Sequence, residues 1–144
     1  MHLLAKSLIR QYHRLLDDLL RHCQSFSLVF ITETWLLPPA RLPTSWQQFH
    51  LYGSPVAGQY RGSMGVSALV SPRCPLPVVE FPVKCKYALG LQLGRSLRLI
   101  CLYLPPSLST AEVQSVLDSL LLTDDTIICA LSFVVGATTM VSTS

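Results

Sequence analysis

Residues 27–35 read Ser-Leu-Val-Phe-Ile-Thr-Glu-Thr-Trp, an apolar run that ends in the carboxylate of Glu33. Five of the six residues before Glu33 are apolar or β-branched, which is typical of a buried strand. In open α/β sheets, ligands bind beyond the carboxyl ends of such strands. The stretch therefore predicts a buried strand with an acidic side chain at the edge where a site would form.

The sequence before and after this strand adds a helix and a loop region. Leucines recur at helical spacing over residues 3–22 and predict an amphipathic helix that covers a sheet. Residues 38–58 are rich in proline and glycine and predict a long irregular region. The short apolar run at residues 66–70 predicts a further strand, which Ser71 and Pro72 end.

The second half of the chain predicts a hairpin, a helix and a last strand. Residues 87–93 and 97–103 are β runs joined by a turn at residues 94–96. Ser109 and Glu112 have capping-box spacing and open a helix that runs to about residue 122. A strand over residues 126–131 and an irregular tail follow. This order predicts a mixed α/β or α+β fold with a largely buried sheet.

The composition is apolar and poor in charge. The chain has 144 residues, which suits one domain, and 50% of them are hydrophobic. Charged residues make up 13%, about half of the share that is usual in soluble domains, and the mean hydropathy is +0.44. Such a chain either buries almost everything or exposes an apolar face. A net charge of +3 permits a nucleic-acid partner without indicating one.

The cysteines and the two terminal segments indicate the cellular location that we expect for the chain. The five cysteines are an odd number without a Cys-x-x-Cys pair, and we expect reduced thiols: Cys23, Cys74, Cys85, Cys101 and Cys129. Reduced thiols indicate an intracellular location, cytoplasmic or nuclear. Lys6 and Arg10 break the amino-terminal apolar run too early for a secretory signal. Residues 126–144 carry no charge but are too polar for a membrane span, so no membrane is expected.

Four segments together resemble a known family. They are Ile-Thr-Glu-Thr-Trp-Leu at residues 31–36, Gly-Val at 65–66, Cys-Leu-Tyr-Leu-Pro-Pro-Ser at 101–107, and Ile-Ile-Cys at 127–129 after the capped helix. In this order and spacing they resemble the endonuclease/exonuclease/phosphatase superfamily. The likeness is greatest to the endonuclease domain that precedes the reverse transcriptase of non-LTR retrotransposons. It covers about residues 15–129.

The resemblance implies a fold and a chemistry. Members of this superfamily are four-layer α/β sandwiches that hydrolyse phosphodiesters with a divalent metal, usually Mg²⁺. Glu33 would then be the metal-ligating carboxylate, because Mg²⁺ takes oxygen ligands and neutralises charge that develops on the scissile phosphate. Tyr103 would match the family's active-site tyrosine, whose phenol can hydrogen-bond a phosphate oxygen. Nucleic acid is the partner that the resemblance implies.

The departures from the family are equally specific. The family has an Asn on a first strand before the helix, and we expect that strand to be missing because Met1 opens almost directly into the predicted helix. Where the family has Gly-Asp-Phe-Asn, residues 130–133 read Ala-Leu-Ser-Phe. The family's closing Ser-Asp-His motif is absent. Asp124 and Asp125 lie at the opposite end of the last strand and are not expected to substitute.

The remaining chemistry-bearing residues favour structural roles. Three histidines lie in or beside the predicted first helix and His50 lies in a predicted loop, so we expect ordinary surface or packing roles for His2, His13, His22 and His50. Arg61 precedes a glycine in a loop and is expected to be solvated. Without the resemblance, Glu33 would be read as a loop acid or a helix cap, and Tyr103 as a strand-end aromatic packing on Pro105.

We therefore expect a degenerate, truncated endonuclease-like domain without catalytic activity of its own. Residues 1–129 would form a partial four-layer sandwich, mainly its first sheet and helices, and residues 130–144 a divergent uncharged tail. Glu33 and Tyr103 would be vestigial metal and catalytic residues, with Mg²⁺ the cofactor if any is bound. Two alternatives remain open: an active Mg²⁺-dependent endonuclease, or an interaction module whose exposed apolar sheet self-associates or meets a partner chain that supplies the missing half.

Overall fold

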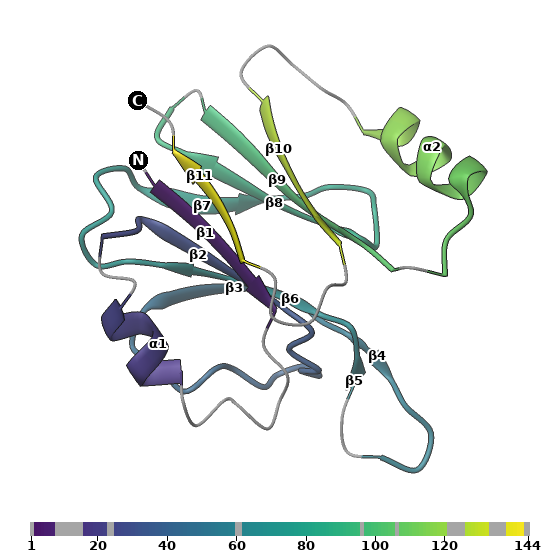
Figure 1. Ribbon diagram of the computed structural model, residues 1–144, viewed down its shortest axis with the longest axis horizontal. Helices are drawn as coiled ribbons and strands as arrows, with labels where there is room; N and C mark the ends of the chain where they lie inside the picture. The colour runs from purple at the N-terminus through teal and green to yellow at the C-terminus, as the bar shows by residue number, and fades with distance from the viewer. Residues whose placement is uncertain are drawn as a thin grey trace. The chain divides into compact units, whose positions relative to one another are not determined.

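The structure, a computed structural model, is a mixed α+β arrangement of mostly antiparallel strands (Figure 1). The chain forms two compact units: a first unit of residues 1–75 with 134–144, and a second unit of residues 76–133. Each unit is considered by itself. The structure describes the following residues: 2–7, 16–22, 25–59, 62–95, 97–105, 107–120, 126–132 and 138–142.

The first unit contains a five-stranded sheet in the order β11-β1-β2-β6-β3 (Figure 1). Its strands are β1 (His2–Ser7), β2 (Leu28–Thr32), β3 (Gln47–Leu51), β6 (Val66–Val70) and β11 (Thr138–Ser142). Strands β1 and β2 are parallel, and the helix α1 (Leu16–His22) lies between them in the sequence. The other pairs are antiparallel. A small two-stranded sheet joins β4 (Ser54–Pro55) to β5 (Gly62–Ser63).

The core of the first unit lies between α1 and the middle of this sheet. Every residue of β2 and β6 is buried. The cluster of buried apolar side chains draws on both the helix and the sheet: Leu16, Leu20, Val29, Ile31, Leu42 and Leu69. The predicted buried strand before Glu33, the strand at residues 66–70 and a helix that covers the sheet are confirmed.

The second unit contains a four-stranded sheet in the order β10-β9-β8-β7. Its strands are β7 (Val78–Phe81), β8 (Ala88–Leu93), β9 (Leu97–Leu104) and β10 (Thr126–Ser132). Strands β8 and β9 form the predicted hairpin, and Gly94 takes a φ of 63° at its turn. Strands β9 and β10 are parallel, with the helix α2 (Thr110–Ser119) between them in the sequence. The predicted capping box of Ser109 and Glu112 is confirmed.

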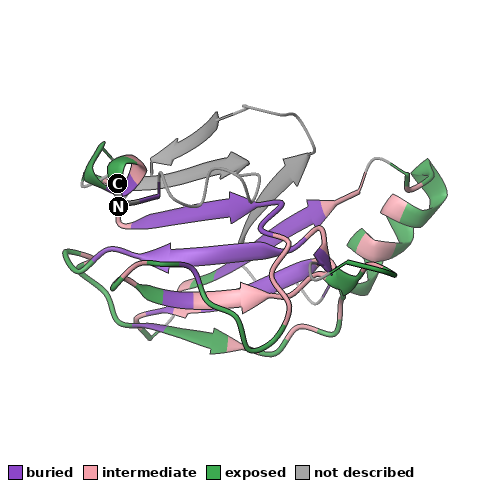
Figure 2. Ribbon diagram, turned by 90° about the horizontal axis from the view of Figure 1, so that it is seen from below, coloured by how far each residue is buried: buried purple, intermediate pink, exposed green. Residues whose placement is uncertain are grey.

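Helix α2 is much less buried than α1. None of its residues is buried, and its ribbon carries only the exposed and intermediate colours (Figure 2). Leu120, just past the helix, is 7% exposed and joins a cluster with Ala88, Ile100 and Leu102. Val116 packs against that cluster, whereas Leu117 is 37% exposed. The predicted apolar side of this helix therefore contacts the sheet mainly at its carboxyl-terminal end.

The helix predicted over residues 3–22 is wrong at its amino-terminal end, because His2–Ser7 form β1. Leucine, alanine and lysine favour a helix locally, but these residues pair with β2 on one side and with β11 on the other. Tertiary pairing overrides a weak local preference. The expectation that the first strand is missing is therefore also wrong. Residues 8–15 of the predicted helix lie outside the described residues.

Two regions predicted to be irregular contain strands. The tail includes Thr138–Ser142, whose β-branched residues suit the strand β11. The region of residues 38–58 includes β3 and β4, and His50 accordingly lies in a strand rather than in a loop. The sequence does not predict strand β7, because the prolines on either side of it resemble a loop pattern. Strand β10 matches the last predicted strand to within one residue.

The exposed apolar sheet is not found on β2 or β6, which are buried throughout. Large exposed apolar side chains of the described residues are few: Leu76, Val79 and Leu117.

Cys74, Cys85 and Cys101 are reduced thiols as predicted, whereas the side chains of Cys23 and Cys129 lie outside the description. Within the described ranges, no helix has the length and apolar character needed to cross a membrane.

Candidate functional site

The candidate site is the segment that leaves the carboxyl end of β2. Glu33 follows the last residue of this strand and is only 9% exposed. The indole Nε1 of Trp35 donates a hydrogen bond of 2.9 Å to Oε2 of Glu33. A carboxylate at the end of a buried strand is therefore present where it was predicted, and one of its two oxygens is engaged by a neighbouring side chain.

The backbone around Glu33 adopts uncommon left-handed conformations. The φ angle is 57° at Glu33, 57° at Trp35 and 64° at Met64. Each such non-glycine residue costs on the order of 1–3 kcal/mol, and clusters of them are found mainly at functional sites. Two hydrogen bonds hold the segments together: Trp35 N–H donates to Met64 O at 2.9 Å, and Gly62 N–H donates to Trp35 O at 2.9 Å. The concentration of strain marks this turn as the candidate site.

A glycine and a buried hydroxyl meet at the same turn. Gly65 has a φ of 101°, and a Cβ atom added there would lie 2.6 Å from Thr34 Oγ1. Thr34 is 1% exposed, and its Oγ1 has no hydrogen-bond partner among the described residues. A buried polar atom without a partner costs about 1–3 kcal/mol. The resemblance included Gly65, and the structure shows that only glycine fits beside Thr34.

The residues around Glu33 do not fit a built Mg²⁺ site. Mg²⁺ prefers near-octahedral oxygen coordination and is usually held by one or two carboxylates together with waters and substrate phosphates. In the part of the chain that the structure describes, no group of three or more His, Cys, Asp or Glu side chains could hold a metal ion. Glu33 supplies one carboxylate, and the Trp35 indole already occupies one of its oxygens. We derive no catalytic step through a metal at this position.

Tyr103 lies near the end of β9 in the second unit and is 1% exposed. Its backbone N–H donates to Tyr87 O at 2.9 Å. In the parallel register of β9 and β10, Leu131 is the residue opposite Tyr103. Glu33 belongs to the first unit and Tyr103 to the second, and each is placed within its own unit. Four other predicted residues lie outside the described residues: His13, Arg61, Asp124 and Asp125.

A buried polar network that the sequence did not reveal surrounds His50. Its Nδ1 lies 2.6 Å from Ser67 Oγ, and its Nε2 lies 2.9 Å from Gln48 Oε1. Because an amide oxygen only accepts, Nε2 carries the proton and Nδ1 accepts from the serine hydroxyl. Burial, and secondarily the charge of Arg41, lowers the pKa of His50 from 6.5 to about 4. His50 is therefore a neutral packing residue at pH 7, in agreement with its predicted structural role.

Gln48 connects this network to the loop before β3. Its Nε2 donates to Leu42 O at 2.9 Å and to Thr44 O at 3.1 Å, and its Oε1 accepts from Leu42 N–H at 3.0 Å. A glutamine on a strand that clamps a loop six residues away has no local sequence signature. His2 lies in β1, and His22 ends α1.

Comparisons with known proteins add no assignment to this geometry. No protein-family model matches the chain, and a search of curated proteins found no match.

Proposed function

We propose that this chain is a degenerate endonuclease-like domain, derived from a metal-dependent phosphodiester hydrolase of the DNA-nicking type and without catalytic activity of its own. The observation that carries the proposal is Glu33, a buried carboxylate in a strained turn at the carboxyl end of β2. The resemblance to the endonuclease/exonuclease/phosphatase superfamily predicts a metal-ligating acid at that position. Sites in α/β sheets form at such strand ends.

The first unit supports the idea of an ancestral site that has lost its partners. Strand β1 lies parallel to β2, and Ser7 pairs with Thr32 next to Glu33. The family carries an asparagine on its first strand, and this sequence contains no asparagine. Glu33 is thus left with a strand in the expected place but without the amide that would share a metal or orient a water.

The second unit supports the loss of the general base and of the water-orienting amide. The parallel pairing of β9 and β10 brings Leu131 opposite Tyr103. Residues 130–133, Ala-Leu-Ser-Phe, occupy the position of the family's Gly-Asp-Phe-Asn motif. An apolar side chain neither accepts a proton nor holds a nucleophilic water. Tyr103 itself is buried, at 1% exposure.

A plasmid-nicking assay tests this proposal directly. Purified protein is incubated with supercoiled plasmid and Mg²⁺, and the relaxed form is quantified for the wild type, Glu33→Gln and the control Glu80→Gln. Glu80 is an exposed residue of β7. We expect all three proteins to give the rate of the protein-free blank. Nicking by the wild type and by Glu80→Gln that disappears in Glu33→Gln would establish the alternative, an active Mg²⁺-dependent endonuclease.

Calorimetric titration with Mg²⁺ provides a second measurement that does not depend on turnover. A single carboxylate with one oxygen engaged should bind Mg²⁺ with no heat above dilution at millimolar concentration. A saturable heat signal that is abolished by Glu33→Gln and retained by Glu80→Gln would show that the turn is still a metal site. Metal binding without nicking would mean that Glu33 still ligates Mg²⁺ in an inactive domain, whereas metal binding together with Glu33-dependent nicking would overturn the proposal.

A further inference from the structure

The first unit contains a cavity of about 270 Å³ that is distinct from the Glu33 turn. We call it the arginine cavity. Its polar and aromatic lining comes from α1, from the loop before β3 and from the turn after β6: Arg21, Thr44, Ser45, Trp46, Ser71 and Arg73. Leu28 at the start of β2 pairs with Val70 at the end of β6. The cavity therefore lies near the amino end of β2, about 15 Å along the strand from Glu33.

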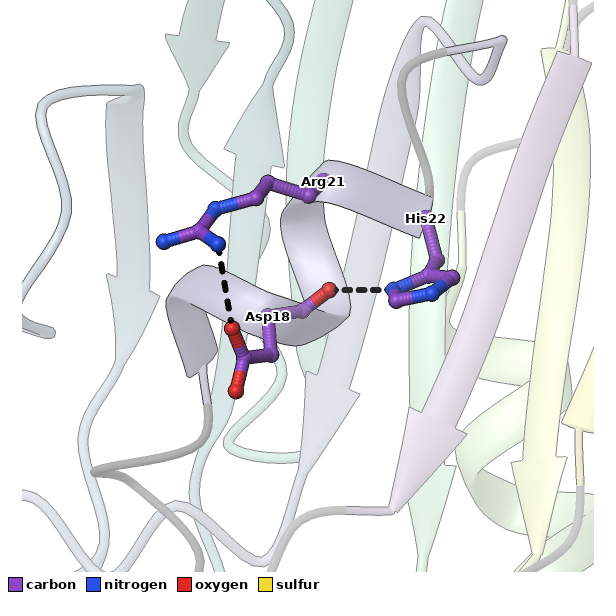
Figure 3. Close-up of polar contacts among 3 residues, drawn as sticks. All are labelled: Asp18, Arg21 and His22. Atoms are coloured by element: carbon purple, nitrogen blue, oxygen red, sulfur yellow. Dashed lines mark hydrogen bonds and ion pairs between the residues drawn. The ribbon is translucent and has the colours of Figure 1, made fainter.

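Two guanidinium groups give the arginine cavity a positive character. Among the described residues, Arg73 has no ion-pair partner. Arg21 Nη1 lies 3.4 Å from Asp18 Oδ1, with both side chains well exposed (Figure 3). An exposed pair of this kind is worth at most about 1 kcal/mol, so an anion can compete for Arg21. Figure 3 also shows His22 on the other side of the helix turn, where its Nδ1–H donates to Asp18 O at 2.6 Å.

Two hydroxyl groups of the lining are arranged as donors. Thr44 Oγ1 accepts from Trp46 N–H at 3.2 Å, and Ser71 Oγ accepts from Arg73 N–H at 3.2 Å. A hydroxyl that accepts from the backbone retains its own proton for a further acceptor. Ser71 is only 4% exposed, so its oxygen has little access to bulk water. Two arginines with hydroxyl donors form the donor set that suits a phosphate group.

The backbone of the lining is held in place by hydrogen bonds within the first unit. Gln48 fixes the loop through its bonds to Leu42 and Thr44, as described above. The turn after β6 is fixed by Ser71 N–H, which donates to Ser27 O at 2.9 Å, and by Cys74 N–H, which donates to Ser71 O at 2.9 Å. Preorganised donors cost less conformational entropy on binding. The backbone that carries the two hydroxyl donors is therefore fixed before a ligand binds.

Trp46 adds an aromatic surface to this cationic lining. It is half-buried, packs against the core cluster that contains Leu16 and Ile31, and also lines the cavity. The cavity volume of about 270 Å³ lies just below the usual range of ligand sites, about 300 to 1,000 Å³, so the ligand must be small. A phosphate with one ring system attached is the ligand class that matches the charge, the aromatic wall and the size. We propose that the arginine cavity binds a phosphate monoester joined to an aromatic ring, of the nucleoside 5′-monophosphate class.

Isothermal titration calorimetry with adenosine 5′-monophosphate, inorganic phosphate and adenosine separates the contribution of the phosphate group to binding from that of the ring system. We expect adenosine 5′-monophosphate to bind most tightly, inorganic phosphate more weakly and adenosine weakest. Arg73→Gln and Arg21→Gln should each weaken binding of the monophosphate about tenfold, which corresponds to about 1.4 kcal/mol. Trp46→Ala should weaken the monophosphate and leave inorganic phosphate unchanged. Thermal unfolding of each variant shows that it is folded.

Two matched controls test whether binding requires the arginine cavity. One removes a positive charge elsewhere in the unit, and the other changes the Glu33 site. Arg41→Gln removes an exposed arginine of the same unit that does not line the cavity, and it should bind like the wild type. Glu33→Gln should also leave binding unchanged, so the outcome is independent of the proposed function. The proposal is overturned if the monophosphate gives no saturable heat at millimolar concentration. It is also overturned if Arg73→Gln and Arg41→Gln behave alike, or if inorganic phosphate binds as tightly as the monophosphate.

Discussion

Both units contain the same local arrangement, a strand, a helix and a parallel strand, but they stabilise the helix in different ways. In the first unit, β1 and β2 flank α1, whose Leu16 is 0% and Leu20 4% exposed. In the second unit, β9 and β10 flank α2, which has no buried residue. The same topology thus places one helix over a core and leaves the other largely in solvent.

The difference in burial follows from how far each helix is stabilised by its own length and capping. Helix α1 has seven residues, too few for an isolated helix to be stable in water, so its formation depends on burying its leucines. Burial of a leucine is worth about 1.5–3 kcal/mol. Helix α2 has ten residues, a complete capping box and an apolar anchor at Leu120 beyond its last turn. Burial of leucines therefore stabilises α1 in the first unit, whereas the capping box and the anchor at Leu120 contribute more to the stability of α2 in the second.

The units also differ in their buried polar groups. Every buried polar or charged residue of the described part lies in the first unit: Thr32, Glu33, Thr34, Gln48, Ser67 and Ser71. Buried polar groups are costly unless they are hydrogen-bonded, and they make a structure sensitive to pH and to single substitutions. The free energy of unfolding of the first unit should therefore fall most when its core or its polar network is changed.

The largest expected effect comes from Leu16→Ala in the core of the first unit. Removing a fully buried leucine costs the transfer free energy and leaves a cavity, so we expect a loss of about 3 kcal/mol in the free energy of unfolding. Urea unfolding followed by tryptophan fluorescence measures it, because Trp35 and Trp46 both lie in the first unit. The matched change in the other helix, Leu117→Ala, should cost less than about 0.5 kcal/mol by circular dichroism. Equal losses would remove the contrast between the two helices.

A smaller effect should appear when the pH is lowered through the titration range of His50. Its pKa is about 4 in the folded protein and 6.5 when exposed, so the unfolded chain binds a proton that the folded chain does not between these values. Stability is therefore full above about pH 6.5 and falls as the pH drops towards 4. The ring is partly exposed, and after allowance for solvent screening we expect a loss of about 1–2 kcal/mol.

A variant isolates the contribution of His50 to this pH dependence. The difference in urea midpoint between pH 7 and pH 4.5, read from tryptophan fluorescence, should be smaller in His50→Gln than in the wild type. His22→Gln replaces an exposed histidine at the end of α1 and should keep the full difference. If His50→Gln and the wild type lose stability in parallel, the network around Ser67 and Gln48 does not carry the pH dependence.

The elements that the sequence predicts correctly are those specified by neighbouring residues. The turn at Gly94 between β8 and β9 and the capping box of Ser109 and Glu112 depend on short-range spacing alone. Strands β1 and β11 depend on each other and on β2, which are far apart in the chain. Their local patterns indicate a helix and an irregular tail, because register and pairing partners are not encoded within either segment.

The candidate site also has one part that the local sequence predicts and another part that it does not. The apolar run of β2 predicts a buried strand with an acid at its end, and the structure places Glu33 there. The left-handed conformations at Trp35 and Met64 and the contact of Thr34 with Gly65 join segments about thirty residues apart, so no local pattern predicts them. The same applies to the arginine cavity, whose lining comes from three separate segments.

The smallest effect tests whether the capping box, rather than burial, holds α2. Ser109 Oγ accepts from Glu112 N–H at 3.1 Å, and Ser109→Ala leaves that donor without a side-chain partner. We expect a loss of about 1 kcal/mol, seen as faster amide hydrogen exchange in the first turn of α2 and unchanged exchange in α1. Ser109→Asp should restore protection because a carboxylate also caps, whereas Ser115→Ala, an exposed change within the helix, should not reduce it. If Ser109→Ala leaves exchange in α2 unchanged, the anchor at Leu120 and the contact of Val116 hold the helix, and the two units then stabilise their helices by the same means.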